Sequence, residues 1–175
     1  VKIGTRPLSD KDGQDVSKLL HIIGDFERIS DHAVNLTEVA DEIHSKKIQF
    51  SAPAQHETAV MRRAVARALT LTVDAFVAND LALAEKVQPL EQVVDLLRSR
   101  IKAAHIDRLK SGCCTIELGF VLSDLLTNLE RVSDHCSNVA ASVIEIERHG
   151  IIDAHEYVRS LSTGEAGERF QQMYL

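Results

Sequence analysis

Apolar residues recur at steps of three and four along most of the chain. The first such series comprises Val16, Leu19, Leu20, Ile23, Phe26, Ile29, Ala33, Leu36, Ala40 and Ile43. This spacing is that of an amphipathic helix, which we expect to run from about Asp12 to about Lys47. Ser9 and Asp10 resemble a helix start. Lys46 and Lys47 suit a helix end because their charge complements the helix dipole.

Two further helices are predicted in the middle of the chain. Ser51 and Pro53 are typical of an N-cap and a first-turn proline, so we expect a second helix over residues 54–78. The third covers residues 81–109, with an N-cap at residue 80. Pro89 lies inside it, removes a backbone donor and clashes with the preceding turn. We therefore expect a kink or short break near Gln88.

The last long series of apolar positions predicts a fourth helix from about Thr115 to about His149, with Gly150 as a signal for its end. A short helix is predicted over residues 153–161, and a loose tail after Ser162. Four long helices joined by short loops predict an all-α fold, an antiparallel bundle. Its 175 residues suggest one domain, residues 1–175.

Composition supports helices and sets the character of the core. The chain has 45% hydrophobic but only 4% aromatic residues and no Trp, so the core must be aliphatic. Only 8 Gly and 3 Pro interrupt it, which favours long helices over a sheet of short strands. The three cysteines form no CxxC pair, and we expect reduced thiols, with a weak alternative of a ligand role for Cys136.

Charge and hydropathy exclude two classes of partner. The net charge is −6 and no Lys/Arg-rich run occurs, so nucleic acid is not an expected partner. Apolar stretches are short and interrupted by charges, so no membrane span is expected in this fragment. No signal peptide is evident, and the first residue is not Met, which suggests a piece of a longer chain.

A repeated nonapeptide carries the strongest chemical signal. ERISDHAVN at Glu27–Asn35 recurs as ERVSDHCSN at Glu130–Asn138, 103 residues later, with six of nine positions identical. The acidic and amide residues of each copy lie at i, i+4 and i+8, so they form one ladder on a helix: Glu27, Asp31 and Asn35, then Glu130, Asp134 and Asn138. Core packing does not require the same polar residues twice.

A third acidic pair, Glu91 and Asp95, occurs one helix before the second copy. The third and fourth helices are expected to be antiparallel neighbours, so Glu91 and Asp95 can face Glu130 and Asp134. Converging carboxylates repel unless a cation or protons neutralise them. Oxygen-only ligands suit Mg²⁺, Mn²⁺, Ca²⁺ or iron. The alternative is a solvated acidic face with no metal.

The remaining polar residues of the repeat have plainer interpretations. His32 and His135 point about 100° away from the preceding Asp and are predicted to be surface or supporting groups rather than ligands. Asn35 and Asn138 are candidates either for a carbonyl ligand or for capping a neighbouring loop. No nucleophile elbow or glycine-rich phosphate loop occurs, so we expect no enzyme. A metal-dependent phosphoesterase using the same carboxylates is the weakest hypothesis.

The sequence Glu-Arg-x-Ser-Asp-His, preceded by an ExxxD pair, resembles the PhoU family. The resemblance covers residues 53–149 as a complete three-helix repeat, residues 12–48 as the last helix of a truncated first repeat, and leaves residues 150–175 as a short helix and tail. The start of the chain looks like the PhoU-like C-terminal region of Na/Pi-cotransporter family proteins.

The resemblance implies an accessory or regulatory role in phosphate transport. It implies metal ions, iron or else manganese, magnesium, zinc or calcium, held by pairs of ExxxD motifs, here best at Glu91, Asp95, Glu130 and Asp134. Glu27 and Asp31 match the metal motif too, but the chain lacks the helix that would supply their partner, so we expect their site to be vacant, half-formed or completed by another subunit. It also implies a cytoplasmic domain tethered to the inner face of the membrane, with a membrane transport domain of the parent chain or another transporter component as its partner. A homodimer is expected because the first helix exposes part of its apolar stripe. A metal-free interaction bundle is the alternative function.

Overall fold

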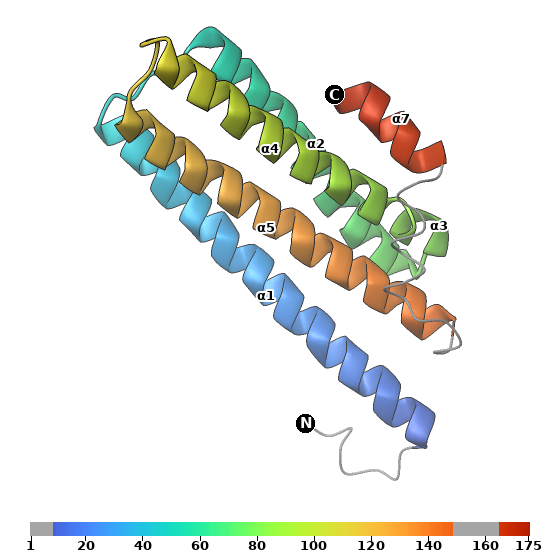
Figure 1. Cartoon of the computed structure of the whole chain (residues 1–175). Helices are drawn as coiled ribbons and strands as arrows, with labels where there is room; N and C mark the ends of the chain where they lie inside the picture. The colour runs from blue at the N-terminus through green and yellow to red at the C-terminus, as the bar shows by residue number, and fades with distance from the viewer. Residues whose placement is uncertain (1–8, 149–164) are drawn as a thin grey trace.

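The computed structural model describes residues 9–148 and 165–175, and all regular structure in these ranges is helical. The helices are drawn in Figure 1 and have these bounds: α1 Asp10–Ser45, α2 Ala52–Ala78, α3 Leu81–Ala84, α4 Val87–Lys110, α5 Ile116–Glu147 and α7 Glu165–Tyr174. The long helices α1, α2, α4 and α5 form a bundle, which confirms the predicted fold class.

Local capping explains where the helices begin. Ser9 accepts a hydrogen bond from the backbone N–H of Asp12, whose carboxylate accepts one from the Ser9 N–H in return, a capping box. The side chains of Ser51, Asp80 and Thr115 accept bonds in the same way from the backbone three residues later. These contacts satisfy N–H groups that a helix leaves unpaired. They confirm the four predicted starts.

The predicted break before Pro89 lies slightly earlier than expected. The short helix α3 ends at Ala84, and α4 begins at Val87 after Lys86, so the interruption falls at residues 85–86 rather than at Gln88. Pro89 is then the third residue of α4. Backbone N–H groups in the first turn have no partner within the helix, so a proline costs little there.

The prediction of a loose tail after Ser162 is wrong for the last eleven residues. Residues Glu165–Tyr174 form α7, which packs mainly on α4. Phe170 and Tyr174 lie partly buried against the core, and Nη1 of Arg100 donates to the carbonyl oxygen of Leu175 at 3.3 Å. This helix depends on contacts with α4 that local sequence does not show. The predicted helix over 153–161 and the end signal at residue 150 lie outside the described residues.

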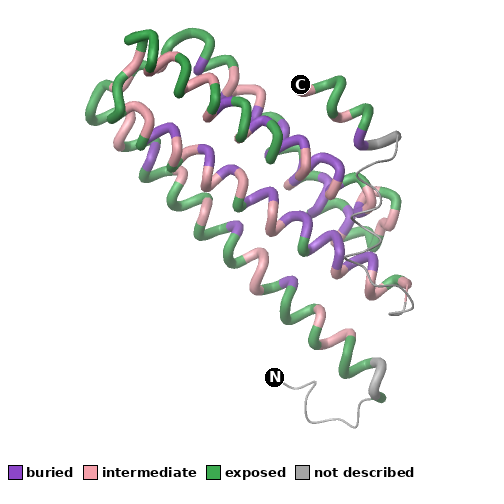
Figure 2. The backbone as a smooth tube through the Cα atoms, viewed as in Figure 1, coloured by how far each residue is buried: buried purple, intermediate pink, exposed green. Residues whose placement is uncertain are grey.

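The core lies between α2, α4 and α5. It is aliphatic, as composition predicted, and its largest fully buried members include Met61, Leu71, Leu90, Ile101 and Leu126. Figure 2 shows buried positions gathered on these helices and sparse along α1. Helix α1 packs chiefly against α5. A T-shaped contact between the rings of Phe26 and Phe76, with centroids 5.4 Å apart, links α1 to α2.

Helices α1 and α5 run side by side in opposite directions (Figure 1). Lys18, near the start of α1, lies 3.6 Å from a carboxylate oxygen of Glu145, near the end of α5. Lys46, just past the end of α1, lies 3.6 Å from Glu117 in the first turn of α5. The two copies of the repeat therefore lie on adjacent antiparallel helices. None of the described helices carries an apolar stretch long enough to cross a bilayer.

Candidate metal centre

Three carboxylates from two helices meet beside the core. Glu91 and Asp95 lie one turn apart on α4, and Asp134 lies on α5, which packs against α4. One carboxylate oxygen from each lies within 4.8 Å of the others. Glu91 and Asp134 are partly buried and Asp95 is exposed. The predicted meeting of the α4 pair with the second copy of the repeat thus brings together three of the four candidate residues. Their role as ligands remains a prediction.

The fourth candidate, Glu130, forms an ion pair with a neighbouring arginine. Its Oε1 lies 3.4 Å from Nη1 of Arg98, one turn beyond Asp95 on α4. The other oxygen, Oε2, is buried and has no hydrogen-bond partner among residues 9–148 and 165–175, and the same holds for Nε of Arg98 and Oγ of Ser133. Unpartnered buried polar atoms are costly. Glu130 therefore has one oxygen available for a further contact close to the three carboxylates.

The electrostatics of the cluster oppose full ionisation. The pKa of Glu91 is raised to about 7, first by burial and then by the charges of Asp95, Asp134 and Glu130. Burial, followed by the charge of Glu130, also raises the pKa of Asp95 and of Asp134. Arg98 and Arg131 partly offset these shifts. Proximity of like charges in a partly dry site is relieved by protons or by a cation.

Hydrogen bonds fix the orientation of two of the carboxylates. Nε2 of Gln88 donates to Oε2 of Glu91 at 2.6 Å, and Gln88 is in turn a close hydrogen-bond partner of Ser137 on α5. Nη1 of Arg131 lies 3.3 Å from Oδ2 of Asp134. Ligand side chains held by neighbouring groups are typical of metal sites. The donor set, oxygen atoms only with a spare buried carboxylate oxygen, fits a hard divalent cation or iron.

The first copy of the repeat has no such surroundings. Glu27 and Asp31 are exposed on α1. Within the described ranges, no group of three potential metal ligands includes either residue. The difference follows from packing, because α1 packs chiefly against α5 among the described helices, whereas α5 also packs against α4, which carries Glu91 and Asp95. The two copies are similar in sequence, but only the second lies beside a further acidic pair.

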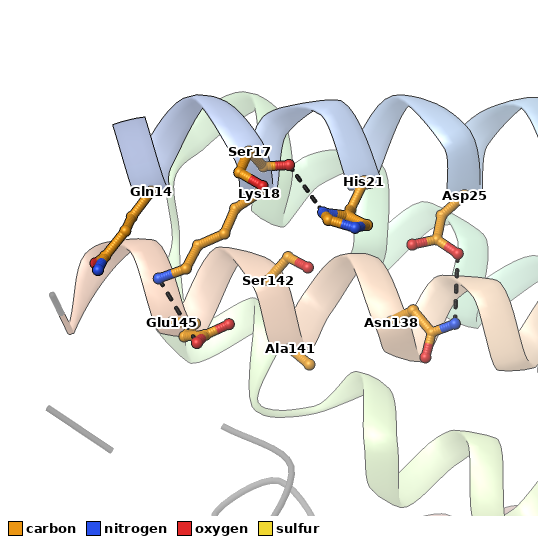
Figure 3. A pocket seen from close by; sticks show the side chains of 9 residues that line it. All are labelled: Gln14, Ser17, Lys18, His21, Asp25, Asn138, Ala141, Ser142 and Glu145. Atoms are coloured by element: carbon orange, nitrogen blue, oxygen red, sulfur yellow. Dashed lines mark hydrogen bonds and ion pairs between the residues drawn. The ribbon is translucent and has the colours of Figure 1, made fainter. Parts of the chain in front are cut away.

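The side-chain amides of Asn35 and Asn138 each donate a hydrogen bond between α1 and α5. Nδ2 of Asn35 donates to Oδ1 of Asn128 on α5 at 3.1 Å. Nδ2 of Asn138 donates to Oδ1 of Asp25 on α1 at 3.3 Å, the contact drawn in Figure 3. Both amides thus join α1 to α5 through their nitrogen atoms, and a ligand role for their carbonyl oxygens stays a prediction. Successive i+4 steps drift around a helix of 3.6 residues per turn, so Asn138 and Glu130 lie on somewhat different sides of α5.

The two histidines of the repeat complete this contact between α1 and α5. His32 Nδ1 lies 2.9 Å from Oδ1 of Asn128, and His135 Nδ1 lies 2.9 Å from Oδ1 of Asp25. The two rings stack with centroids 5.8 Å apart. Asp25 and Asn128 are themselves separated by the repeat offset of 103 residues. The arrangement has an approximate two-fold symmetry, in which each copy binds the residue just outside the other.

A polar groove of about 810 Å³ lies between α1 and α5. Its lining, shown in Figure 3, comes from both helices and includes Lys18, His21, Asp25, Asn138 and Glu145. Nδ1 of His21 contacts the backbone oxygen of Ser17 at 2.8 Å. None of the three clustered carboxylates lines this groove. The groove and the acidic cluster are therefore separate features of α5.

Reasoning from the sequence missed Arg98, Gln88, Asp25 and Asn128. Arg98 follows Asp95 by three residues, a spacing that places it on the same helix face, so a search around each acidic pair could have found it. Asp25 and Asn128 each lie two residues before a copy of the nonapeptide, outside the segment that repeats. Their common offset was visible, but one is an acid and the other an amide.

The fold and site define an all-helical bundle with a carboxylate cluster at the junction of two antiparallel helices. Residues 58–143, from α2 to α5, match the family model described as the PhoU domain. This span includes Glu91, Asp95, Glu130 and Asp134 but not the first copy of the repeat. The chain is therefore similar to PhoU domains over the part that forms the cluster.

The chain is also similar to a named protein of Thermotoga maritima, the phosphate-specific transport system accessory protein PhoU homolog 1. The two are 28% identical over 149 residues, which cover 85% of this chain and 62% of that relative. The chain thus spans less than two thirds of the length of this relative. The relative's name describes an accessory protein of a transport system. No solved structure matches the chain.

Proposed function

We propose that this chain is a PhoU-like accessory domain that regulates phosphate transport and binds a metal ion between α4 and α5. The observation that carries the metal proposal is the convergence of Glu91, Asp95 and Asp134 inside the span that matches the PhoU domain. The similarity to a phosphate-specific transport accessory protein supports the regulatory role. The proposed ligands are the three carboxylates, with Glu130 joining through its unpartnered oxygen.

The chemistry of this site favours charge neutralisation over catalysis. A hard cation would relieve the repulsion that raises the pKa of Glu91 to about 7. Binding a cation joins α4 to α5 and stiffens the unit that carries the site. The candidate ions are iron and manganese, then magnesium, zinc and calcium. A regulatory domain can use such a site as a structural clamp.

The metal proposal is tested by binding measurements on purified protein. Protein prepared without chelator is expected to contain metal by elemental analysis, and Mn²⁺ added to stripped protein is expected to raise its melting temperature. Asp134→Asn and Glu91→Gln each remove one ligand and should weaken Mn²⁺ binding at least tenfold. The matched control, Glu27→Gln with Asp31→Asn, removes the same chemistry from the first copy and should leave binding unchanged.

A metal-free interaction bundle is the second candidate, and the ion pair between Arg98 and Glu130 favours it because one acid is already neutralised. This function predicts no bound metal and no thermal shift with Mn²⁺ or iron. It also predicts that Asp134→Asn leaves stability unchanged or raises it, because one repelling charge is lost. These outcomes would remove the metal proposal while leaving a regulatory role intact.

The proposed partner is a membrane-bound phosphate transport component, either a transport domain of a Na/Pi-cotransporter type in the same polypeptide or a separate subunit. A cytoplasmic position beside the membrane and a homodimer belong to the same proposal. Exposed apolar side chains on α1, namely Leu19, Leu20, Ile23 and Val34, supply a surface for such contacts. Affinity capture with the tagged domain should recover the transport component, and an Ile23→Asp variant should recover less of it.

A further inference from the structure

Two consecutive cysteines lie in the loop between α4 and α5. Gly112, with a φ of 70°, turns the chain just before them. Cys113 is exposed, and its Sγ lies 3.7 Å from the carbonyl oxygen of Ser111. Cys114 is partly buried, and its Sγ lies 3.7 Å from Nδ1 of His105 and 3.7 Å from the His105 carbonyl oxygen. Adjacent in sequence, the two thiols have different neighbours.

The imidazole of His105 lies close to the backbone of α5 at Gly119. A Cβ atom at Gly119 would lie 2.7 Å from Nε2 of His105, so a larger residue there would displace the ring from its present position. Glycine inside a helix costs about 1 kcal/mol relative to alanine. The close approach of His105 explains why a glycine occupies that position. The ring is thus positioned between the α5 backbone and the sulfur of Cys114.

A cationic side chain, that of Arg108, also lies near the Cys114 thiol. Arg108, one turn beyond His105 on α4, donates two hydrogen bonds of 2.9 Å to the carboxylate of Glu57. Its pKa is raised first by that hydrogen bond, then by the charge of Glu57 and, least, by electrostatic interaction with Cys114. Thiols placed next to basic groups and partly open to solvent are the reactive ones in proteins.

We propose that Cys114 is a nucleophilic thiol, with His105 as its base, that exchanges with small disulfides. Sγ of Cys114 attacks one sulfur of R–S–S–R while its proton passes to Nδ1 of His105. The new Cys114–S–S–R bond forms as the S–S bond of the reagent breaks. The leaving thiolate takes the proton from the imidazolium and departs as R–SH. The site is therefore a place for S-thiolation at one end of the bundle, independent of the acidic cluster.

The other two cysteines provide internal comparisons. Cys136 is fully buried, and burial raises the pKa of its thiol to about 11, so it is expected to be inert in the folded protein. Cys113 is more accessible than Cys114, but the contact of its sulfur is with a carbonyl oxygen rather than with a base. Accessibility alone would make Cys113 the faster thiol. Our proposal requires Cys114 to be faster.

The test uses the full chain and an aromatic disulfide, 5,5′-dithiobis(2-nitrobenzoate), whose released thiolate is followed by absorbance. Cys113→Ser leaves Cys114 as the accessible thiol, and Cys114→Ser leaves Cys113. The Cys113→Ser protein is expected to react at least tenfold faster, a modest share of what a positioned base supplies. Peptide mass spectrometry should assign the adduct to Cys114. Equal rates, or a faster Cys114→Ser protein, would overturn the proposal.

The role of the base is tested in the Cys113→Ser protein. His105→Gln should slow the reaction at least tenfold, whereas the control His44→Gln, an exposed histidine on α1, should leave it unchanged. Gly119→Ala should also slow it, because the new Cβ displaces the ring. If His105→Gln reacts at the parent rate, Cys114 needs no base and the proposal is wrong. Circular dichroism of each variant separates loss of reactivity from loss of folding.

Discussion

At the scale of single residues, the partly buried Glu91 has a strongly raised pKa. Its pKa is about 7 instead of 4.5, so the folded protein binds this proton more tightly than the unfolded chain does. The stability contributed by protonated Glu91 is fully present below about pH 4.5 and is lost as pH rises through about 7. The loss is on the order of 1–2 kcal/mol, reduced from the full shift by solvent screening.

Glu91→Gln removes this proton and tests the assignment. In metal-free protein the variant should lose less stability between pH 5 and pH 8 than the parent, a range that brackets the raised pKa of Glu91. Urea denaturation at several pH values measures the difference. With Mn²⁺ present the order should reverse, because metal binding needs the ionised carboxylate and strengthens as pH rises. Identical pH profiles for the two metal-free proteins would contradict the burial of Glu91 described above.

The acidic pairs show what a sequence reveals about a site and what it leaves out. The antiparallel arrangement of neighbouring helices was enough to place Glu91 and Asp95 opposite Asp134. It did not show that Arg98 holds Glu130, because that depends on which rotamers the packed helices leave open. From the sequence, the histidines of the repeat are predicted to be surface or supporting groups. The asparagines are predicted to be carbonyl ligands or to cap a neighbouring loop. Their true partners, Asp25 and Asn128, lie outside the repeated nonapeptide.

At the scale of elements, helix starts were predictable because capping is local. Ser9, Ser51, Asp80 and Thr115 each satisfy backbone N–H groups within three residues, so the sequence around them contains the whole interaction. Helix α7 was missed for the opposite reason. It is held by contacts with α4, about 70 residues earlier, and by the bond from Arg100 to Leu175. Short helices are marginal without such packing.

Two glycine-to-alanine substitutions, one within helix α1 and one in the loop between α4 and α5, should change stability in opposite directions. Gly24 lies within α1, and a Cβ there would meet nothing within 4 Å. Gly24→Ala should therefore raise the free energy of unfolding by about 0.5–1 kcal/mol. Gly112 has a φ of 70°, so Gly112→Ala should lower it by about 1 kcal/mol. Urea midpoints of the two variants measure both changes, and a shift of the same sign in both would refute the explanation.

The packing of α7 on α4 is tested by substituting one residue on its buried face and one on its exposed face. Phe170 packs partly buried against the core, whereas Met173 is 58% exposed. Phe170→Ala should destabilise the protein by about 1–2 kcal/mol, less than a fully buried phenylalanine would. Met173→Ala should have an effect within about 0.5 kcal/mol. Thermal denaturation of the two variants distinguishes a docked helix from one that contributes nothing, for which both would be neutral.

At the scale of the whole molecule, the repeat organises two kinds of contact around α5. One face carries Asp134 toward the acidic pair of α4, and another carries His135 and Asn138 toward α1. The same residues on α1 use only the second contact, through His32 and Asn35. Both copies of the repeat therefore contribute to the contact between α1 and α5, and the second copy also contributes Asp134 to the candidate cation site.

This division predicts how protection from hydrogen exchange should respond to metal. The core is formed by α2, α4 and α5, and α1 contacts it mainly through α5, so α1 should open at lower free energy than the other long helices. Adding Mn²⁺ should slow exchange in the segments around Glu91 and Asp134, because a bound ion stabilises the folded state by mass action. The segment around Asp31 should change little, since its carboxylates face solvent.

Deuterium uptake followed by mass spectrometry of peptides resolves the two copies of the repeat in one experiment. The Asp134→Asn protein is the control, and Mn²⁺ should then protect neither segment. Equal protection of both segments by Mn²⁺ in the parent protein would mean that the first copy also binds metal, through a partner supplied by another molecule. The repeat alone makes the copies look equivalent, and packing of α4 against α5 makes them chemically different. Exchange measures that difference directly.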